Sequence, residues 1–181
     1  MSAGTALRLS RSAVACMHDV RIRRALSDDA AGIANIYNHY IRDSVVTFEE
    51  QEVTAADMAG RLAAVRANSL PWLVAEHAGA IVGYAYADRW KQRSAYRYSV
   101  ESTIYLDARR TGAGLGTNLY QQFLGTLPPA VHAVIGGIAL PNAASIALHE
   151  SLGFAKVAHF HQVGFKFKRW IDVGYWQKTL G

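Results

Sequence analysis

The sequence has little cysteine, no long apolar run and no block of basic residues. Its only cysteine, Cys16, cannot form a disulfide within the chain, which favours a reducing compartment, and we expect a cytoplasmic protein. No segment approaches the roughly 18 uninterrupted apolar residues of a membrane-spanning helix, so we expect no membrane insertion. The formal charge of +5 is not gathered into a run of Lys and Arg, and we therefore expect no nucleic-acid partner.

Length and composition indicate one ordinary domain. The 181 residues are 51% apolar and only 18% charged, which is enough to bury one sizeable core. Residues 1–19 differ from the rest, since Arg8 and Arg11 are scattered among Ser, Ala and Leu without a strand pattern. We interpret this stretch as a disordered extension, or as the product of an upstream start codon with Met17 as the working initiator. Residues 20–181 are expected to form a single domain.

Strand and helix patterns alternate from residue 20 onward. Extended segments are expected at residues 20–25, 45–48, 72–76, 81–87, 96–106, 131–139, 154–165 and 174–179. Helices are expected at about 29–42, 54–70, 116–127 and 142–152. Alternation along the strand 96–106 places Glu101 on its polar face. The order of the elements predicts a three-layer α/β domain, with a mixed central β-sheet and helices on both faces.

A glycine-rich turn with the sequence RRTGAGLGT lies at residues 109–117, between a predicted strand and a predicted helix. Its three glycines let the backbone approach a ligand closely, and free amides at the helix start can bind phosphate oxygens. A P-loop would need lysine after the last glycine, where Thr117 stands instead. A Rossmann fingerprint would need Gly-x-Gly-x-x-Gly near the first βα unit. By itself the turn is either a phosphate site or only a tight connection.

The turn resembles the pyrophosphate-binding motif of GNAT acetyltransferases, in which Gln or Arg is followed by two residues, Gly, one residue, and Gly or Ala. The helix pattern favours a register with Thr111 at the first position, although Arg109 fits the same pattern two residues earlier. Further blocks resemble the phosphinothricin and methionine sulfoximine acetyltransferase branch: residues 37–40 (YNHY), 100–105 (VESTIY), 140–142 (LPN), 148–150 (LHE), 152–154 (LGF) and 172–177 (DVGYWQ). The resemblance covers residues 20–180 and implies a GNAT-type fold that uses acetyl-CoA as co-substrate and no metal.

The resemblance also implies where acetyl-CoA would bind. The expected cofactor-binding residues are Ile104, Tyr105, Leu106, Thr111, Gly112, Ala113, Gly114, Leu115, Gly116, Thr117, Asn142 and Ser145. In either register the amides around residues 112–117 would hold the pyrophosphate. Asn142 would contact the pantetheine arm, or would only cap the helix that it precedes.

Amide formation from an amine and a thioester needs a base for the ammonium, a stabilised oxyanion and a proton for the departing thiolate. The resemblance places the general base at Glu101, which agrees with the polar-face position of this residue. Without the resemblance, Glu101 would be interpreted as an exposed strand residue or an ion-pair partner of Arg97. His149 is expected to protonate the thiolate or to assist the base, while the alternative is a packed helical histidine.

The acceptor is expected to be a small amino-acid-like amine. The resemblance makes residues 90–96 a substrate wall, and the expected substrate-binding residues are Phe48, Lys91, Arg93 and Tyr96, with the alternative of a solvated basic loop. Trp170 and Asp172 match a tail that often helps to form a homodimer. His159 and His161 share one strand face, but no third ligand stands at a readable spacing, so we expect a surface pair and no metal site.

These observations predict direct transfer of acetyl from acetyl-CoA to the amine of a phosphinothricin- or methionine sulfoximine-type acceptor. Two alternatives stay open at this point. The first is a GNAT enzyme that acetylates a peptide N-terminus or another amine. The second is a noncatalytic acyl-CoA-binding module, against which the presence of both Glu101 and His149 counts.

Overall fold

The computed structural model describes residues 19–181, so the expectation for residues 1–19 lies outside the described residues except at Asp19. In this part of the chain seven strands form one sheet, in the order β1-β2-β3-β4-β5-β7-β6. The strands are β1 (Val20–Arg24), β2 (Trp72–His77), β3 (Ala80–Arg89), β4 (Ser99–Leu106), β5 (Ala133–Ala139), β6 (Ala155–Lys166) and β7 (Arg169–Thr179). The helices are α2 (Ala30–Asp43), α3 (Ala55–Ala67), α4 (Leu115–Gly125) and α5 (Ala143–Ser151), with short 3-10 helices η1 (Ser27–Asp29), η2 (Ser94–Tyr96) and η3 (Ala108–Arg110).

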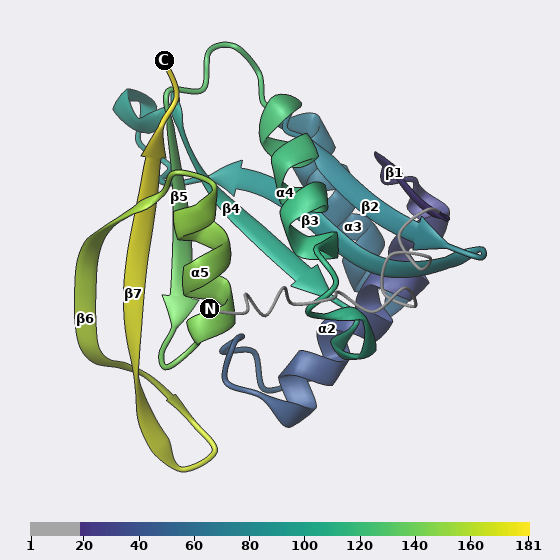
Figure 1. Cartoon of the computed structure of the whole chain (residues 1–181), viewed down its shortest axis with the longest axis horizontal. Coiled ribbons are helices and arrows are strands. Elements are labelled where there is room, and N and C mark those ends of the chain that lie inside the picture. Colours follow the sequence, from purple (N-terminus) through teal and green to yellow (C-terminus); the bar gives the residue numbers. More distant parts are fainter. Residues whose placement is uncertain (1–18) are drawn as a thin grey trace, which may run out of the picture.

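Helices cover both faces of the sheet, as the sequence predicts (Figure 1). Neighbouring residues of β2 show the division, because Leu73 packs into the core beneath α4 while Val74 packs into the core beneath α2 and α3. The α4 side buries Leu119 and Phe123 completely. The three-layer α/β prediction is therefore confirmed, and each face of the sheet has its own apolar core.

The sheet opens between β4 and β5, its parallel pair. Residues 99–101 of β4 pair with residues 133–135 of β5, and the pairing then stops while both strands continue. Every other neighbouring pair in the described sheet is antiparallel. Figure 1 shows the two strands spreading apart as β4 approaches the turn before α4. The sheet thus contains a gap, and the backbone groups of β4 and β5 that face this gap are not paired with another strand.

Two segments differ from the sequence-based expectations. Residues 45–47 form bends, and residue 48 likewise belongs to no strand. Their carbonyl oxygens are held by side chains from other elements: Tyr105 donates to the carbonyl oxygen of Val46 at 3.4 Å, and the buried Lys166 donates to that of Thr47 at 2.9 Å. Tyr96 belongs to η2, so the strand expected at residues 96–106 begins at Ser99, three residues later than expected.

The final hairpin is longer than predicted. Strand β7 begins at Arg169 rather than near Gly174, and only Phe167 and Lys168 separate it from β6. Both turn residues have positive φ, 51° and 58°, a backbone conformation that hairpin turns usually assign to Gly or Asn. The sequence therefore contains none of the usual turn residues at this hairpin turn. Within residues 19–181 no helix combines the length and the apolar character needed to cross a membrane.

Candidate functional site

A cavity of about 790 Å³ lies at the opening between β4 and β5. It extends from the glycine-rich turn before α4, along the end of β4 and the start of α5, to α2 and the loop after it. Its lining consists of Tyr37, Tyr40, Val46, Thr47, Tyr86, residues 101–106, Thr111, Gly112, Gly114, Gly116, Thr117, residues 137–139, Asn142, Ala144, Ser145 and residues 147–149 and 151. One continuous space thus joins the turn to the middle of the sheet.

The glycine-rich turn exposes backbone toward this cavity. Gly112 and Gly114 have φ of +80° and +82°, where a side chain would be strained. Gly114 also stands at the N-cap of α4, and no side chain caps that helix. The first amides of α4 therefore point their N–H groups at the cavity, with the positive end of the helix dipole behind them. An anion such as a pyrophosphate fits this place.

Most of the expected cofactor residues line the cavity. Those in the lining are Ile104, Tyr105, Leu106, Thr111, Gly112, Gly114, Gly116, Thr117, Asn142 and Ser145. Ala113 and Leu115 are not part of the lining, and Leu115 is 5% exposed within the core beneath α4. The carboxamide oxygen of Asn142 accepts a hydrogen bond from the Ser145 amide at 3.0 Å, so it caps α5 at the cavity wall.

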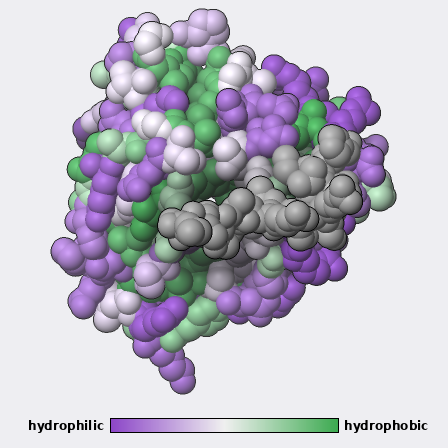
Figure 2. All heavy atoms as spheres, in the orientation of Figure 1, coloured by the Kyte–Doolittle hydropathy of each residue, from purple (hydrophilic) through white to green (hydrophobic). Residues whose placement is uncertain are grey.

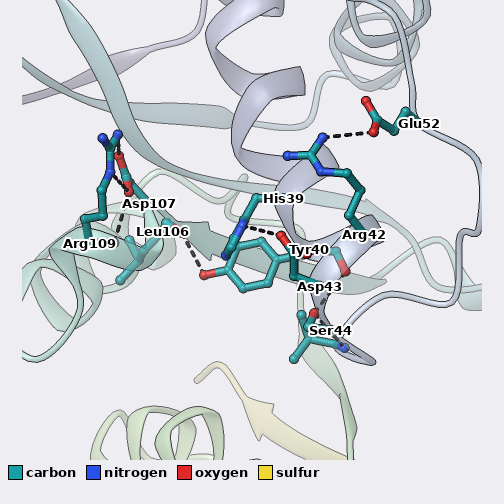
Figure 3. Close-up of polar contacts among 10 residues, drawn as sticks. His39, Tyr40, Arg42, Asp43, Ser44, Glu52, Leu106, Asp107 and Arg109 are labelled. Atoms are coloured by element: carbon teal, nitrogen blue, oxygen red, sulfur yellow. Dashed lines mark hydrogen bonds and ion pairs between the residues drawn. The ribbon is translucent and has the colours of Figure 1, made fainter. Parts of the chain in front are cut away.

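Polar contacts attach α2 to the end of β4 beside the turn (Figure 3). The Tyr40 hydroxyl donates to the carbonyl oxygen of Leu106 at 2.7 Å. The next residue, Asp107, accepts two hydrogen bonds from the Arg109 side chain, at 2.7 and 3.0 Å. Arg109 is therefore ion-paired with Asp107 at the rim of the turn. These contacts fix the strand end from which the turn departs.

Glu101 lies where β4 and β5 begin to separate, and its carboxylate reaches into the cavity. Its Oε1 atom lies 3.3 Å from the position that a Cβ on Gly137 would occupy. Burial raises the pKa of Glu101 above its usual value, the positive charge of Lys91 lowers it, and the negative charge of Asp88 raises it. The carboxylate is thus a stronger proton acceptor than an exposed glutamate.

His149 projects from α5 beneath β5 and is only 4% exposed. Its Nδ1 lies 2.8 Å from the carbonyl oxygen of Ser145, which can only accept, so Nδ1 carries the proton. Its Nε2 lies 3.2 Å from the hydroxyl of Tyr120, which in turn lies 2.6 Å from Ser102 Oγ. Burial lowers the pKa of His149, and the ring is neutral near pH 7 with Nε2 as an acceptor.

The four expected substrate residues lie outside the cavity lining. Phe48 packs against Gly164 of β6. The Lys91 ammonium stands 4.6 Å from the centre of the Trp90 ring and acts on Glu101 through its charge. Arg93 and Tyr96 are exposed. The structure therefore brings Lys91 toward Glu101 but does not gather these four side chains around one acceptor.

Tyrosine side chains line the cavity, and of these only Tyr105 is among the expected site residues. Tyr37, Tyr40, Tyr86 and Tyr105 line the cavity. Tyr175 of β7 lies beside Glu101, since both come within 3.3 Å of the same position above Gly137. Tyr37 also belongs to the core beneath α2 and α3, where it is 8% exposed. The number of tyrosines, nine in all, is the one sequence signal of a polar aromatic wall.

Comparisons with known proteins agree with this geometry. Residues 22–174 match the Acetyltransferase (GNAT) domain family. The chain is 39% identical to phosphinothricin N-acetyltransferase of Streptomyces viridochromogenes over 89% of this chain and 88% of the relative. It is 37% identical to an L-methionine sulfoximine/L-methionine sulfone acetyltransferase of Salmonella typhimurium, over 88% and 94%.

A solved structure adds a similarity in three dimensions. It is a GNAT superfamily phosphinothricin acetyltransferase from Sinorhizobium meliloti in complex with acetyl-CoA, with 34% identity and a TM-score of 0.84. The superposition covers 90% of this chain and 89% of that structure. Sequence family, fold and a glycine turn that opens onto a split sheet thus lead to the same assignment, and the chain belongs to the GNAT acetyltransferase family.

Proposed function

We propose that this protein transfers acetyl from acetyl-CoA to the amine of a small amino-acid-like acceptor of the phosphinothricin or methionine sulfoximine type. The observation that carries the proposal is the single cavity that joins the anion-binding turn before α4 to Glu101 at the β4–β5 opening. The names of the relatives supply the acceptor class. The complex of the Sinorhizobium meliloti relative supplies the acetyl donor.

The chain's own groups fit acetyl-CoA, which supplies the acetyl thioester when bound. The amides at the start of α4 hold the pyrophosphate, and the positive φ of Gly112 and Gly114 keeps side chains out of its way. The backbone groups at the β4–β5 opening bind the pantetheine arm along the gap. Asn142 and Ser145 line the same wall, at the start of α5.

Glu101 removes a proton from the acceptor ammonium, directly or through water, because burial makes it a better base than an exposed carboxylate. The amine nitrogen then bonds to the acetyl carbon while the carbon–sulfur bond breaks. Sulfur leaves with the electron pair and takes up the proton that the new amide nitrogen releases. His149 keeps the Tyr120–Ser102 chain in place, since its neutral ring presents an acceptor at Nε2 rather than a proton for sulfur.

An assay of thiol release with acetyl-CoA tests the proposal. The acceptor panel is phosphinothricin, methionine sulfoximine, methionine sulfone, ordinary amino acids and short peptides, with Glu101→Gln and Glu76→Gln compared in each case. Glu76 lies on β2 and outside this cavity, so its variant controls for removal of a carboxylate. We expect turnover with at least one amino-acid analogue and loss of turnover in Glu101→Gln alone. Acetyl-CoA binding without turnover on any acceptor would favour a noncatalytic module.

One observation favours a second acceptor class. Glu101 is the one charged side chain that the cavity lining contains among residues 19–181, if His149 is neutral. An acceptor carboxylate would therefore meet tyrosine hydroxyls inside the cavity, with Lys91 acting from its edge. A peptide N-terminus carries no carboxylate next to its amine and needs no such cation. Preferential turnover of short peptides in the same panel would establish this alternative.

We also propose a homodimer formed through the β6–β7 hairpin, and a cytoplasmic location, which the single cysteine supports. The exposed large apolar residues of the hairpin are Val157, Phe160, Val163, Phe165, Phe167 and Trp170. Figure 2 shows apolar residues reaching the surface between polar ones on the side where β6 and β7 lie. Such a patch favours burial against a second copy of the chain. Sedimentation of the wild type and of Phe165→Glu with Trp170→Glu tests this, and a monomeric wild type would refute it.

A further inference from the structure

The β6–β7 hairpin brings together three side chains that lie apart in the sequence. His159 and His161 project from one face of β6, and Asp172 projects toward them from β7. His159 Nε2 lies 2.7 Å from Asp172 Oδ2, and His161 Nδ1 lies 3.0 Å from the same oxygen. The three ligand atoms all lie within 4.8 Å of one another. Asp172 therefore adds a third group able to bind a metal ion, which the sequence pattern did not show.

Two of the three separations are close to the spacing of neighbouring ligand atoms around one metal ion. With metal–ligand bonds of about 2.1 Å, adjacent ligand atoms lie about 3.0 Å apart around an octahedral ion and about 3.4 Å apart around a tetrahedral one. The two nitrogen–oxygen separations, 2.7 and 3.0 Å, are hydrogen-bond lengths and are also close to the octahedral value. Two imidazoles and one carboxylate on a common face leave the remaining positions to water.

The carboxylate is oriented before any ion arrives. The backbone N–H of Gln162 donates to Asp172 Oδ1 at 2.9 Å, which leaves Oδ2 for the two histidines. Gln162 adopts φ of 53° in the irregular stretch where the β6–β7 register shifts between Phe160 and Gly164. An aspartate carboxylate is anionic near neutral pH, so this ligand carries a negative charge. A backbone contact of this kind is what orients ligands in metal sites.

One neighbour opposes a cation. The Lys156 ammonium lies 3.4 Å from His159 Nδ1 and donates to it, which places the ring proton on Nε2, toward Asp172. A metal at Nε2 must displace that proton and move the ring proton to Nδ1, and the Lys156 contact is then lost. Lys156 therefore weakens the site through its charge and through the ring tautomer that it favours. Removal of Lys156 should therefore strengthen metal binding, whereas removal of a ligand should weaken it.

We propose that His159, His161 and Asp172 bind one divalent transition-metal ion, of the Ni²⁺ or Zn²⁺ type, across the β6–β7 hairpin. None of the three residues lines the acetyl-transfer cavity, so the ion is not part of the reaction. It joins the two strands where their pairing is interrupted. The site therefore stabilises the hairpin that carries the exposed apolar residues, and binding does not depend on the proposed acetyl transfer.

Calorimetric titration of the full chain, without a histidine tag, with NiCl₂ and with ZnCl₂ tests the proposal. We expect one ion per chain with an affinity in the micromolar range. Asp172→Asn and His161→Ala should each weaken binding at least tenfold, and Lys156→Met should strengthen it severalfold. His132→Ala, which removes an exposed histidine outside the cluster, should change nothing.

Asp172→Asn distinguishes a three-ligand site from an ordinary histidine pair. Its amide oxygen still accepts from Gln162, so the hairpin keeps its geometry while the anionic ligand is lost. Binding that survives this substitution, binding that His132→Ala weakens equally, or no binding at all would overturn the proposal. As a second readout, NiCl₂ should raise the unfolding temperature of the wild type and leave that of Asp172→Asn unchanged.

Discussion

Replacing Gly136 by alanine should displace the buried ring of His149. A Cβ at this position would lie 2.6 Å from Nε2 and 2.8 Å from Cδ2 of the ring, about 0.8 Å inside the 3.4 Å at which ordinary contact begins. The ring cannot retreat freely, because it packs edge-on against Tyr120 and Phe154 with centroids 5.1 Å away. Overpacking costs about 1–3 kcal/mol, and loss of the hydrogen bond to Tyr120 adds about 1 kcal/mol. The free energy of unfolding should fall by about 2–4 kcal/mol.

Urea unfolding of four variants measures this effect: Gly136→Ala, His149→Ala, the double variant and Gly60→Ala. Gly60 lies inside α3 with no atom within 4 Å of its ideal Cβ, so alanine there should stabilise the helix slightly and serves as the control. In the double variant the ring that clashes is gone. Its loss of stability should therefore be smaller than the sum of the two single losses by about 1–3 kcal/mol.

Two outcomes would refute the reasoning. If Gly136→Ala is as stable as Gly60→Ala, the ring has room that the structure does not show. If the stability losses of Gly136→Ala and His149→Ala simply add, the alanine at position 136 does not act through a clash with the His149 ring. Activity gives an independent check, because a displaced His149 releases Tyr120 and Ser102, the residue next to Glu101.

Further predictions concern the base, the acceptor side and the turn. Glu101→Gln should lower kcat about 10²- to 10⁴-fold in the thiol-release assay, and the wild-type rate should fall with decreasing pH through a pKa above the usual glutamate value. Because burial raises the pKa of Glu101 in the folded state, the wild type loses stability as pH rises through this pKa. Glu101→Gln should therefore be more stable than the wild type at pH 7 and equally stable below pH 4.5, which the midpoints of urea unfolding measure. Gly137→Ala would place a Cβ 3.3 Å from Glu101 Oε1 and from the Tyr175 ring, and should raise the acceptor KM with little effect on acetyl-CoA affinity. Gly114→Ala, at φ of +82°, carries about 1–2 kcal/mol of backbone strain and should raise the KM for acetyl-CoA about 5- to 30-fold.

Local patterns predicted much of the fold because the physical causes are local. Thr54 and Asp57 form a capping box at the start of α3, the Asn142 side chain caps α5, and Gly153 follows the end of α5 with φ of +85°. Such signals depend on residues three or four positions apart, which a sequence displays directly. The GNAT resemblance is likewise confirmed, and so is the three-layer arrangement of a mixed sheet between helices.

Contacts between distant residues could not be predicted in this way. The segment at residues 45–48 is held by Lys166, which follows it by more than a hundred positions, so its extended appearance was misleading. The β6–β7 turn uses Phe167 and Lys168 at positive φ, against their ordinary preferences. Asp172 reaches His159 across that hairpin. For residues 45–48 and for His159, the determining partner is set by tertiary packing rather than by neighbours in the sequence.

The two adjacent glycines of β5 explain how the split sheet becomes a site. Successive residues of a strand face opposite sides, so Gly136 leaves room for His149 on the α5 side, while Gly137 leaves room for Glu101 and Tyr175 on the other. Both lie just beyond Ile135, where pairing with β4 ends. Side chains at these positions would fill the space beside the β4–β5 opening on both faces of the sheet. A glycine pair weakens a central strand, and its presence here is consistent with a passage through which donor and acceptor meet.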